Sequence, residues 1–329
     1  MKKAFILTIL YLITGYCGMA QTIRYVKPVA AGTGSGNSWA NASADLQAMI
    51  NASVANDEVW VATGTYYPTA TTDRTISFVM KAGVKIYGDF PGTGNPVFAD
   101  RNLALYETIL SGDIDRNDGP NFANNSGNSF HVVSNDNNGL TSTAVLDGFT
   151  IMGGNANGSI INNQRNGAGM LNVSASPKLV NVIFSFNNAA SSGGGLYNQS
   201  SSPELYNVIF SGNNAGSQGG AIANSSASPF IANAIFWDNN AGISGGALQN
   251  LTLSSAPIIK NSIFWGNTTG GTTVSNISGG STSVTYSDLE GGFTGTGNIN
   301  QNPLFVNAAD PDGADNKMGT ADDGLKLLP

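Results

Sequence analysis

Short apolar clusters recur along the chain from about residue 177 onward, and each is bounded by Asn, Gly, Ser or Pro. They share a phenylalanine with a proline seven residues before it and an asparagine three residues after it: Phe184, Phe210, Phe236 and Phe264. The spacings between these phenylalanines are 26, 26 and 28 residues. Apolar runs this short, ended by turn residues, predict β-strands and not helices.

This internal repeat predicts an all-β fold, a three-sided parallel β-helix (a solenoid) with coils of about 26 residues. A helical repeat would need apolar residues at helical spacing over about a dozen positions, which the density of Gly, Asn and Ser opposes. A leucine-rich repeat would need a leucine and asparagine scaffold that the chain lacks. In each coil one strand would cover the Asn-x-Ile-Phe stretch and another the Gly-Gly-Ala-Ile/Leu-x-Asn stretch, with a third, less regular piece near the proline.

The repeated residues then gain structural roles. The phenylalanines would stack inward as an aromatic ladder, and amide groups would hydrogen-bond from coil to coil along four aligned asparagines: Asn181, Asn207, Asn233 and Asn261. Glycine pairs such as Gly219-Gly220 would mark positive φ angles or places too close for a β-carbon. Three Asn-x-Ser/Thr sequences recur in register, so we interpret their asparagines as structural and not as glycosylation sites: Asn198, Asn224 and Asn250.

Residues 21–145 are less regular. Residues 43–52 predict a short helix with Ser43 or Asn41 as N-cap, and three of its apolar residues fall on one face: Leu46, Met49 and Ile50. Three apolar segments after it predict strands: 58–62, 76–80 and 84–87. We expect the helix to cap the N-terminal end of the β-helix, because an open end is an unpaired sheet edge.

The first twenty residues are typical of a secretory signal peptide. Lys2 and Lys3 precede an apolar stretch of about eleven residues, too short to cross a bilayer, and small residues precede a cut before Gln21. Lipidation at Cys17 is the alternative, although Tyr16 stands where that signal has a small residue. We therefore divide the chain into a signal peptide, an N-terminal cap with irregular coils, regular repeats and an Asp/Gly-rich C-terminal loop: 1–20, 21–145, 146–300 and 301–329.

The composition of the chain limits the classes of partner that it can bind. Charged residues make up only 11% of the chain and hydrophobic residues 41%, which favours a packed, uncharged polar structure over disorder. Without residues 1–20 the chain has 12 basic residues (14 − 2) against 21 acidic ones, a net charge of about −9. Phosphate binding needs clustered Lys and Arg, so we expect no nucleic-acid partner. No later segment is long and apolar enough to span a membrane.

Several motifs resemble those of exported β-helix proteins. Phe-x-x-Asn at 210–213 and Gly-Gly-Ala-Ile at 219–222 resemble the repeats of polymorphic outer membrane proteins. Other stretches look like large secreted β-helix proteins of Bacteroidetes-type bacteria: 25–28, 38–41, 45–48, 59–66, 146–151, 302–306 and 322–325. The resemblance implies a right-handed parallel β-helix of the cell envelope, outer membrane or medium, in families mostly without a defined reaction. Such families often carry a C-terminal sorting or autotransporter domain, so we expect a chain ending at Pro329 to be a truncated product.

Two acidic clusters suggest calcium loops. The C-terminal one offers three carboxylates, and the earlier one alternates oxygen ligands: Asp310, Asp312 and Asp315, then Asp113, Asp115 and Asn117. Carboxylate and amide oxygens are the ligands that Ca²⁺ prefers. The alternative is that Asp, Asn and Gly are ordinary turn residues. No cofactor is required by either interpretation, and Ca²⁺ is the one candidate ion.

The remaining candidate chemistry is sparse. No catalytic residues can be assigned, and His131, the sole histidine, has no orienting carboxylate nearby in the sequence, so we expect it on a strand surface. Trp237 and Trp265 directly follow stacked phenylalanines and would point outward on neighbouring coils. This pair is the candidate ligand-binding site, with partial burial under a loop as the alternative.

These observations favour a secreted or cell-surface β-helix that works as an adhesin, scaffold or passenger without catalysis. A polysaccharide or the surface of a host or neighbouring cell would be its partner. The alternative is a carbohydrate-active β-helix enzyme, a polysaccharide lyase or a protein like a glycoside hydrolase, with a site at the loop Asp113–Asp118.

Overall fold

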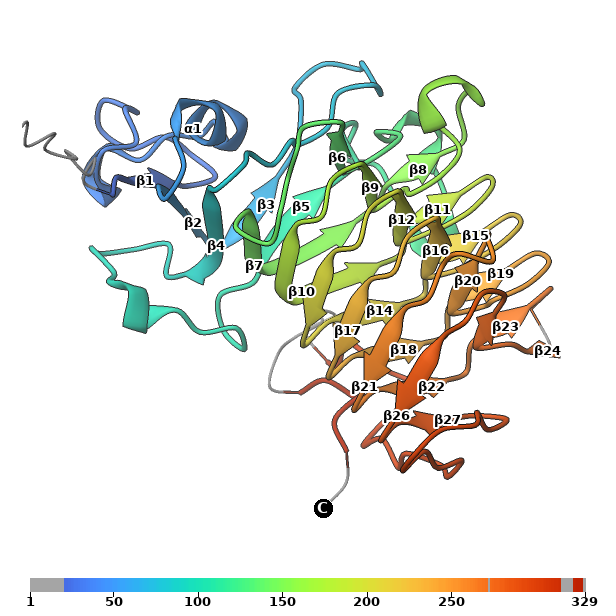
Figure 1. Ribbon diagram of the computed structural model, residues 1–329. Helices are drawn as coiled ribbons and strands as arrows, with labels where there is room; N and C mark the ends of the chain where they lie inside the picture. The colour runs from blue at the N-terminus through green and yellow to red at the C-terminus, as the bar shows by residue number, and fades with distance from the viewer. Residues whose placement is uncertain (1–20, 272, 315–321, 328–329) are drawn as a thin grey trace, which may run out of the picture.

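The computed structural model describes residues 21–271, 273–314 and 322–327. It confirms the predicted fold class, a three-sided parallel β-helix with a short N-terminal helix (Figure 1). The predicted signal peptide at 1–20 lies outside the described residues. None of the helices in the described ranges has the length and apolar character that a membrane crossing requires.

The strands form three sheets. The large sheet has 15 strands: β1 (Ile23–Val26), β2 (Glu58–Ala62), β3 (Gly64–Tyr66), β4 (Lys85–Phe90), β5 (Thr108–Ser111), β7 (Val145–Met152), β10 (Lys178–Ser185), β13 (Glu204–Tyr206), β14 (Ile209–Ser211), β17 (Phe230–Ala232), β18 (Ile235–Trp237), β21 (Ile258–Lys260), β22 (Ile263–Trp265), β26 (Ser283–Thr285) and β27 (Asp288–Leu289). The second has six: β6 (Val133–Asp136), β9 (Met170–Val173), β12 (Leu196–Gln199), β16 (Ile222–Ser225), β20 (Leu248–Asn250) and β25 (Ile277–Ser278).

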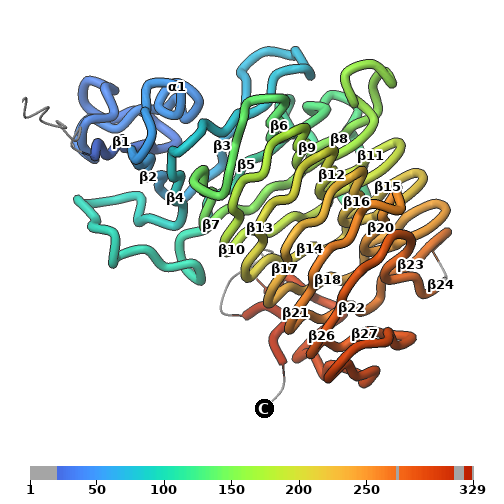
Figure 2. The backbone as a smooth tube through the Cα atoms, in the orientation of Figure 1, coloured from blue at the N-terminus to red at the C-terminus, as the bar shows by residue number. Residues whose placement is uncertain are grey.

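The third sheet also has six strands, each of two residues: β8 (Asn155–Ala156), β11 (Asn188–Ala189), β15 (Asn214–Ala215), β19 (Asn240–Ala241), β23 (Thr268–Thr269) and β24 (Thr273–Val274). Strand pairs are parallel throughout, except that β24 pairs with β23 antiparallel. Short 3₁₀ turns join some strands: Trp39–Asn41, Phe98–Asp100, Pro120–Phe122, Asn125–Gly127 and Ile161–Asn163. The backbone trace shows the coils stacked one on the next (Figure 2).

Identical repeat positions face each other across coils. Phe184 pairs with Phe210, Phe210 with Phe236, and Phe236 with Phe264. All four phenylalanines are fully buried, and their rings stack with centroids 4.7, 5.0 and 4.2 Å apart. The predicted aromatic ladder is therefore confirmed. Burial of these rings is a main source of stability in coils that have no disulfide.

The longer, 28-residue coil keeps this register. Ile231 of β17 still pairs with Ile259 of β21, so the two additional residues do not shift the strands. They fall in the turn at 251–256, where Leu253 is 91% exposed. The extra length is absorbed at a corner of the β-helix.

The predicted asparagine ladder is confirmed on the outer surface. The amide of Asn207 donates to Asn181 at 3.1 Å, and that of Asn233 donates to Asn207 at 3.1 Å. These residues adopt left-handed backbone angles, with φ between 49° and 55° at the four positions. Asparagine tolerates this region better than most residues, which explains its place at the corner that divides β13 from β14 and β17 from β18.

Two further asparagine ladders are buried. One joins Asn187, Asn213, Asn239 and Asn267 through bonds of 2.9–3.0 Å. The other joins Asn135, Asn172, Asn198, Asn224 and Asn250 through bonds of 2.9–3.1 Å. The structural role predicted for the asparagines of the Asn-x-Ser/Thr sequences is thus confirmed. Buried amides are tolerated because each finds partners in the coils above and below.

The glycine pairs have the two predicted roles. Gly219 has φ 69°, a left-handed conformation that suits glycine. At Gly220, a β-carbon would collide with the carbonyl oxygens of Gly246 and Asn240 in the next coil. The first glycine of each pair turns the chain, and the second allows the coils to approach.

The N-terminal helix α1 (Leu46–Ala52) begins later than predicted. Its N-cap is Asp45, whose carboxylate accepts a hydrogen bond from the Ala48 backbone N–H at 2.8 Å. The prediction of Ser43 or Asn41 as N-cap is wrong, because the Ser43 hydroxyl accepts instead from the Asp45 N–H in the turn before the helix. The predicted apolar face is confirmed, since Leu46 and Ile50 join the main core of the coils.

The strand predicted at 76–80 is reduced to a single bridge between Phe78 and Val133. The Met80 backbone N–H donates to the side chain of Asn135 at 3.1 Å, which replaces the continued ladder. Predicted strands at 58–62 and 84–87 are present as β2 and β4.

Candidate functional site

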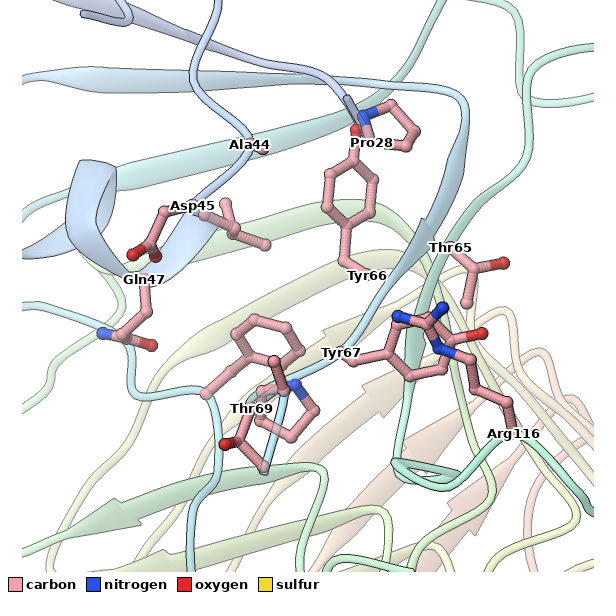
Figure 3. A pocket seen from close by; sticks show the side chains of 13 residues that line it. Pro28, Ala44, Asp45, Gln47, Thr65, Tyr66, Tyr67, Thr69 and Arg116 are labelled. Atoms are coloured by element: carbon pink, nitrogen blue, oxygen red, sulfur yellow. The ribbon is translucent and has the colours of Figure 1, made fainter. Parts of the chain in front are cut away.

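A cavity of about 530 Å³ lies where the helical cap meets the first coils, and we call it the cap pocket. Its lining comes from α1, β3 and the segments around them: Pro28, Ala44, Asp45, Leu46, Gln47, Thr65, Tyr66, Tyr67, Pro68, Thr69, Ala70, Phe78 and Arg116. Figure 3 shows Asp45 and Gln47 on one side of the pocket and Tyr67 with Arg116 on the other, with Tyr66 between them. Its volume falls in the range of small-ligand sites.

Aromatic side chains build the rigid part of the cap pocket. The Tyr66 hydroxyl donates to the Ala62 carbonyl at 2.8 Å. Burial raises the pKa of Tyr66 far above its ordinary value, so the phenol stays neutral. The guanidinium of Arg116 lies over the ring of Tyr67 at 4.6 Å, a cation–π contact that holds both side chains.

The opposite wall is set by the start of α1. One carboxylate oxygen of Asp45 caps the helix, as described above. Gln47 is fixed by Val79, whose N–H donates to its side-chain oxygen at 2.8 Å and whose carbonyl accepts from its amide at 3.1 Å. The pocket therefore presents an acceptor group on one wall and a cationic donor on the other.

A second cavity of about 130 Å³ lies on the outer side of the large sheet, and we call it the carboxylate pocket. It is lined by residues from β4, β7, β10, β14 and the segment before β5: Asp89, Leu103, Glu107, Gly148, Phe149, Thr150, Asn181, Ile183, Asn207 and Ile209. The Thr150 hydroxyl donates to the Glu107 carboxylate at 2.9 Å. Two carboxyl groups thus border one small cavity.

Arg101 organises the charges beside this pocket. Its guanidinium contacts the Asp147 carboxylate at 3.0 Å in a largely buried ion pair and donates to the Gly88 carbonyl at 2.8 Å. Asn181, the first asparagine of the outer ladder, donates to the same Asp147 carboxylate at 2.9 Å. Gly148, at φ 79°, is essential to the packing because a β-carbon there would collide with Asp89 and Arg101.

Asp89 is the most perturbed acid of this group. Its pKa is raised to about 8, mainly by burial and also by the nearby Asp147 and Glu107 carboxylates, against the opposing effects of Arg101 and the Thr108 N–H. A buried carboxyl that keeps its proton near neutral pH is the kind of group that can act as a proton donor.

Sequence reasoning missed this carboxylate pocket. Its two acids lie in one coil, Asp89 in β4 and Glu107 just before β5, and a long insertion separates them in the sequence. This region has no regular repeat, so the sequence spacing gives no register there. One signal for the pocket was present in the sequence, an aspartate next to a glycine in both strands: Gly88-Asp89 and Asp147-Gly148. These pairs lie side by side, because Tyr87 of β4 aligns with Asp147 of β7.

The first predicted calcium loop is held by its own hydrogen bonds. Asp113 accepts from the backbone N–H groups of Asn117 at 3.0 Å and Asp118 at 3.3 Å. Asp115 accepts from the Asn117 amide at 2.9 Å. Burial raises the pKa of Asp118 to about 6, opposed by a hydrogen bond from Asn128 and supported by the charges of Asp113 and Asp115.

Within the described ranges, no three His, Cys, Asp or Glu side chains come together in a way that could hold a metal ion. Calcium sites also use amide and backbone oxygens, so calcium at Asp113, Asp115 and Asn117 stays a prediction. In the C-terminal loop, Gly313 turns the chain at φ 68° and its N–H donates to the Asp310 carbonyl at 3.3 Å. Asp315 lies outside the described residues, and the calcium prediction for Asp310, Asp312 and Asp315 stays open.

The two outward tryptophans are neighbours, as predicted. Trp237 pairs with Trp265 across β18 and β22, and both are half-buried. Phe305 from the C-terminal segment packs edge-on against Trp237 with ring centroids 5.3 Å apart. A cavity of about 230 Å³ remains between the tryptophans and this segment. A ligand-binding role for the pair stays a prediction.

His131 is buried, so the prediction of a surface position is wrong. Its Nδ1 lies 2.9 Å from the Gly167 carbonyl oxygen, and burial lowers its pKa to about 4. Its Nε2 has no hydrogen-bond partner among the described residues. Gly167, which supplies this contact, lies in the insertion between β8 and β9.

The fold defines the chain as a parallel β-helix repeat protein, with two pockets near its capped end. Comparison with protein-family models, with curated proteins and with solved structures gives no match for this chain.

Proposed function

We propose that this chain is an exported protein of the cell surface, cell envelope or medium that acts as a non-enzymatic adhesin, scaffold or passenger. The observation that carries the proposal is the continuous stack of hydrogen-bonded coils from β1 to β27, which presents the cap pocket at one end. Coils stabilised by buried aromatic and amide ladders make a rigid support. The signal-like segment at 1–20 and the net charge of about −9 (12 basic, 21 acidic residues) suit an exported, soluble surface.

We also propose a more specific class for this β-helix. The Phe-x-x-Asn and Gly-Gly-Ala-Ile/Leu motifs favour a right-handed β-helix with repeats like those of polymorphic outer membrane proteins, in a Bacteroidetes-type bacterium. The partner is a polysaccharide or the surface of a host or neighbouring cell. Nucleic acid is disfavoured by the scarcity of basic residues.

Two measurements test this function. Antibodies against residues 21–329 should label intact cells that produce the full chain, or detect the chain in their medium. Recovery of the chain only from the cytoplasm would refute the proposal of export. The purified chain should bind cells or polysaccharides without releasing unsaturated or reducing ends, and clear turnover would contradict the non-enzymatic assignment.

A carbohydrate-active enzyme is the second candidate, and the carboxylate pocket favours it. Asp89, with its raised pKa, is suited to donate a proton, and Glu107 borders the same cavity. If the chain cleaves a polysaccharide there, Asp89→Asn and Glu107→Gln should each abolish the release of sugar ends. Asp113→Asn, in the loop first predicted to hold the site, should leave that release unchanged.

A further inference from the structure

We propose that the cap pocket binds a neutral saccharide. The inference rests on the proposed function only for the general nature of the partner, and it names the site and the ligand class. The cavity has the volume of a small-ligand site, with the pair Tyr67–Arg116 on one wall and an acceptor, Asp45, on the other.

Arg116 supplies a fixed donor group. Its guanidinium is held over the Tyr67 ring, and among the described residues it has no hydrogen-bond or ion-pair partner. A guanidinium that contacts a ring through its carbon keeps its N–H groups for other partners. These donors border the cavity, where they can bind the hydroxyl or ring oxygens of a sugar.

Asp45 supplies the complementary acceptor. One of its carboxylate oxygens binds the Ala48 N–H of α1, so the orientation of the side chain is fixed by the helix. The other oxygen can accept hydrogen bonds from sugar hydroxyls. Thr65 and Thr69 add hydroxyl groups to the lining, while Pro28 adds an apolar surface. A sugar offers donors, acceptors and apolar C–H groups, which matches this mixture.

The charges around the pocket favour a neutral sugar over an acidic one. Arg116 is flanked on its own loop by Asp113, Asp115 and Asp118, and Asp45 lies across the cavity. The mature chain is also acidic as a whole, with 12 basic residues against 21 acidic ones. The negative charges around the pocket would repel a polyanion, whereas they exert no net repulsion on a neutral saccharide.

The test is calorimetric titration of purified residues 21–329 with four trisaccharides. Maltotriose, cellotriose and xylotriose are the neutral probes, and trigalacturonic acid is the acidic one. We expect at least one neutral probe to bind, and we expect its Kd to change less than about twofold between low and high salt, because no net charge is neutralised. Failure of all three neutral probes, or tighter binding of the acid with strong salt dependence, would overturn the inference.

Variants then locate the binding. Arg116→Gln should weaken binding about tenfold or more, since it removes a charge-assisted hydrogen-bond donor. Tyr67→Ala should act in the same direction, and Tyr67→Phe, which keeps the ring, should bind nearly normally. The matched control is Arg165→Gln, which removes a cation from another coil and should leave the Kd unchanged.

Equal losses in Arg116→Gln and Arg165→Gln would show that the cap pocket is not the site. Far-ultraviolet circular dichroism of each variant separates lost binding from lost folding. The result is independent of export: a surface-exposed chain that binds none of the neutral probes overturns this inference alone, and a cytoplasmic chain that binds one overturns the proposed function alone.

Discussion

The buried asparagine ladder allows a sharp prediction at Asn213. Its amide nitrogen donates to Asn239 at 2.9 Å and to the Phe184 carbonyl at 2.8 Å, and its oxygen accepts from the Asn187 side chain at 3.0 Å and backbone N–H at 3.2 Å. In Asn213→Ala these four bonds are lost together with a longer one to the Ser211 carbonyl at 3.3 Å, and the Asn187 backbone N–H is left buried without this partner. Each of the four shorter bonds contributes about 1 kcal/mol, and the buried donor left without a partner costs about 1 kcal/mol more. The free energy of unfolding should therefore fall by about 5 kcal/mol.

The matched control is Asn207→Gly in the outer ladder of the same coil. Asn207 is exposed and bonds to Asn181 and Asn233, but water can replace these contacts. Glycine keeps the left-handed backbone, with φ 54°, that this corner requires. We expect a loss below about 1 kcal/mol, because exposed hydrogen bonds contribute little net free energy.

A third variant, Asn213→Asp, keeps the volume and changes only the hydrogen bonding. It turns an amide donor into an acceptor that faces the Phe184 carbonyl, so it should destabilise at least as much as alanine at pH 7. Urea unfolding of residues 21–329, followed by circular dichroism, gives the free energies, and amide hydrogen exchange shows whether opening is confined to the adjoining coils. Equal losses in Asn213→Ala and Asn207→Gly would refute the argument that burial gives the ladder its strength.

Four other predictions rest on individual side chains of the described residues. Asp89 has a pKa of about 8 in the folded state against an ordinary 3.8, so between these values the folded state binds one more proton than the unfolded state. The free energy of unfolding should therefore fall as pH rises toward 8, by at most about 1.4 kcal/mol per pH unit. Urea midpoints measured between pH 6.5 and 8 should show this fall in the parent chain and not in Asp89→Asn. His131 has the opposite sign, because its pKa of about 4 lies below the ordinary 6.5 and stability should rise with pH between these values, a slope that is missing in His131→Gln. Ca²⁺ titrated to millimolar concentration should release heat that Asp113→Asn or Asp310→Asn reduces, and no heat in the parent chain would remove both calcium predictions. Phe305→Ala should shift tryptophan emission to longer wavelength because Trp237 loses its covering ring, and an unchanged spectrum would show that this contact does not persist in solution.

The regular coils could be predicted because their side chains repeat at a fixed interval. Phe184, Phe210 and Phe236 stand 26 residues apart, and a stack of coils turns that interval directly into contact. The buried asparagine ladders were harder to predict from the sequence, because burial of a polar residue depends on hydrogen-bond partners in two other coils.

The irregular part could not be predicted to the same depth. Two residues that favour N-cap positions, Ser43 and Asp45, stand close together, and only the backbone geometry selects Asp45. The carboxylate pocket depends on the register between β4, β5 and β7, where no sequence repeat fixes the alignment. His131 is buried and contacts Gly167 of a neighbouring insertion, which periodicity does not reveal.

The 28-residue coil shows that a single coil of the β-helix can become longer without a change in strand register or core packing. The turn at 251–256 adds residues while Phe236 and Phe264 keep their stacking distance of 4.2 Å. Because each coil contacts mainly its neighbours, an insertion at this corner costs little more than the ordering of the loop itself. The corner can therefore carry a foreign peptide, such as an epitope or a short binding sequence, held at a fixed height along the rod.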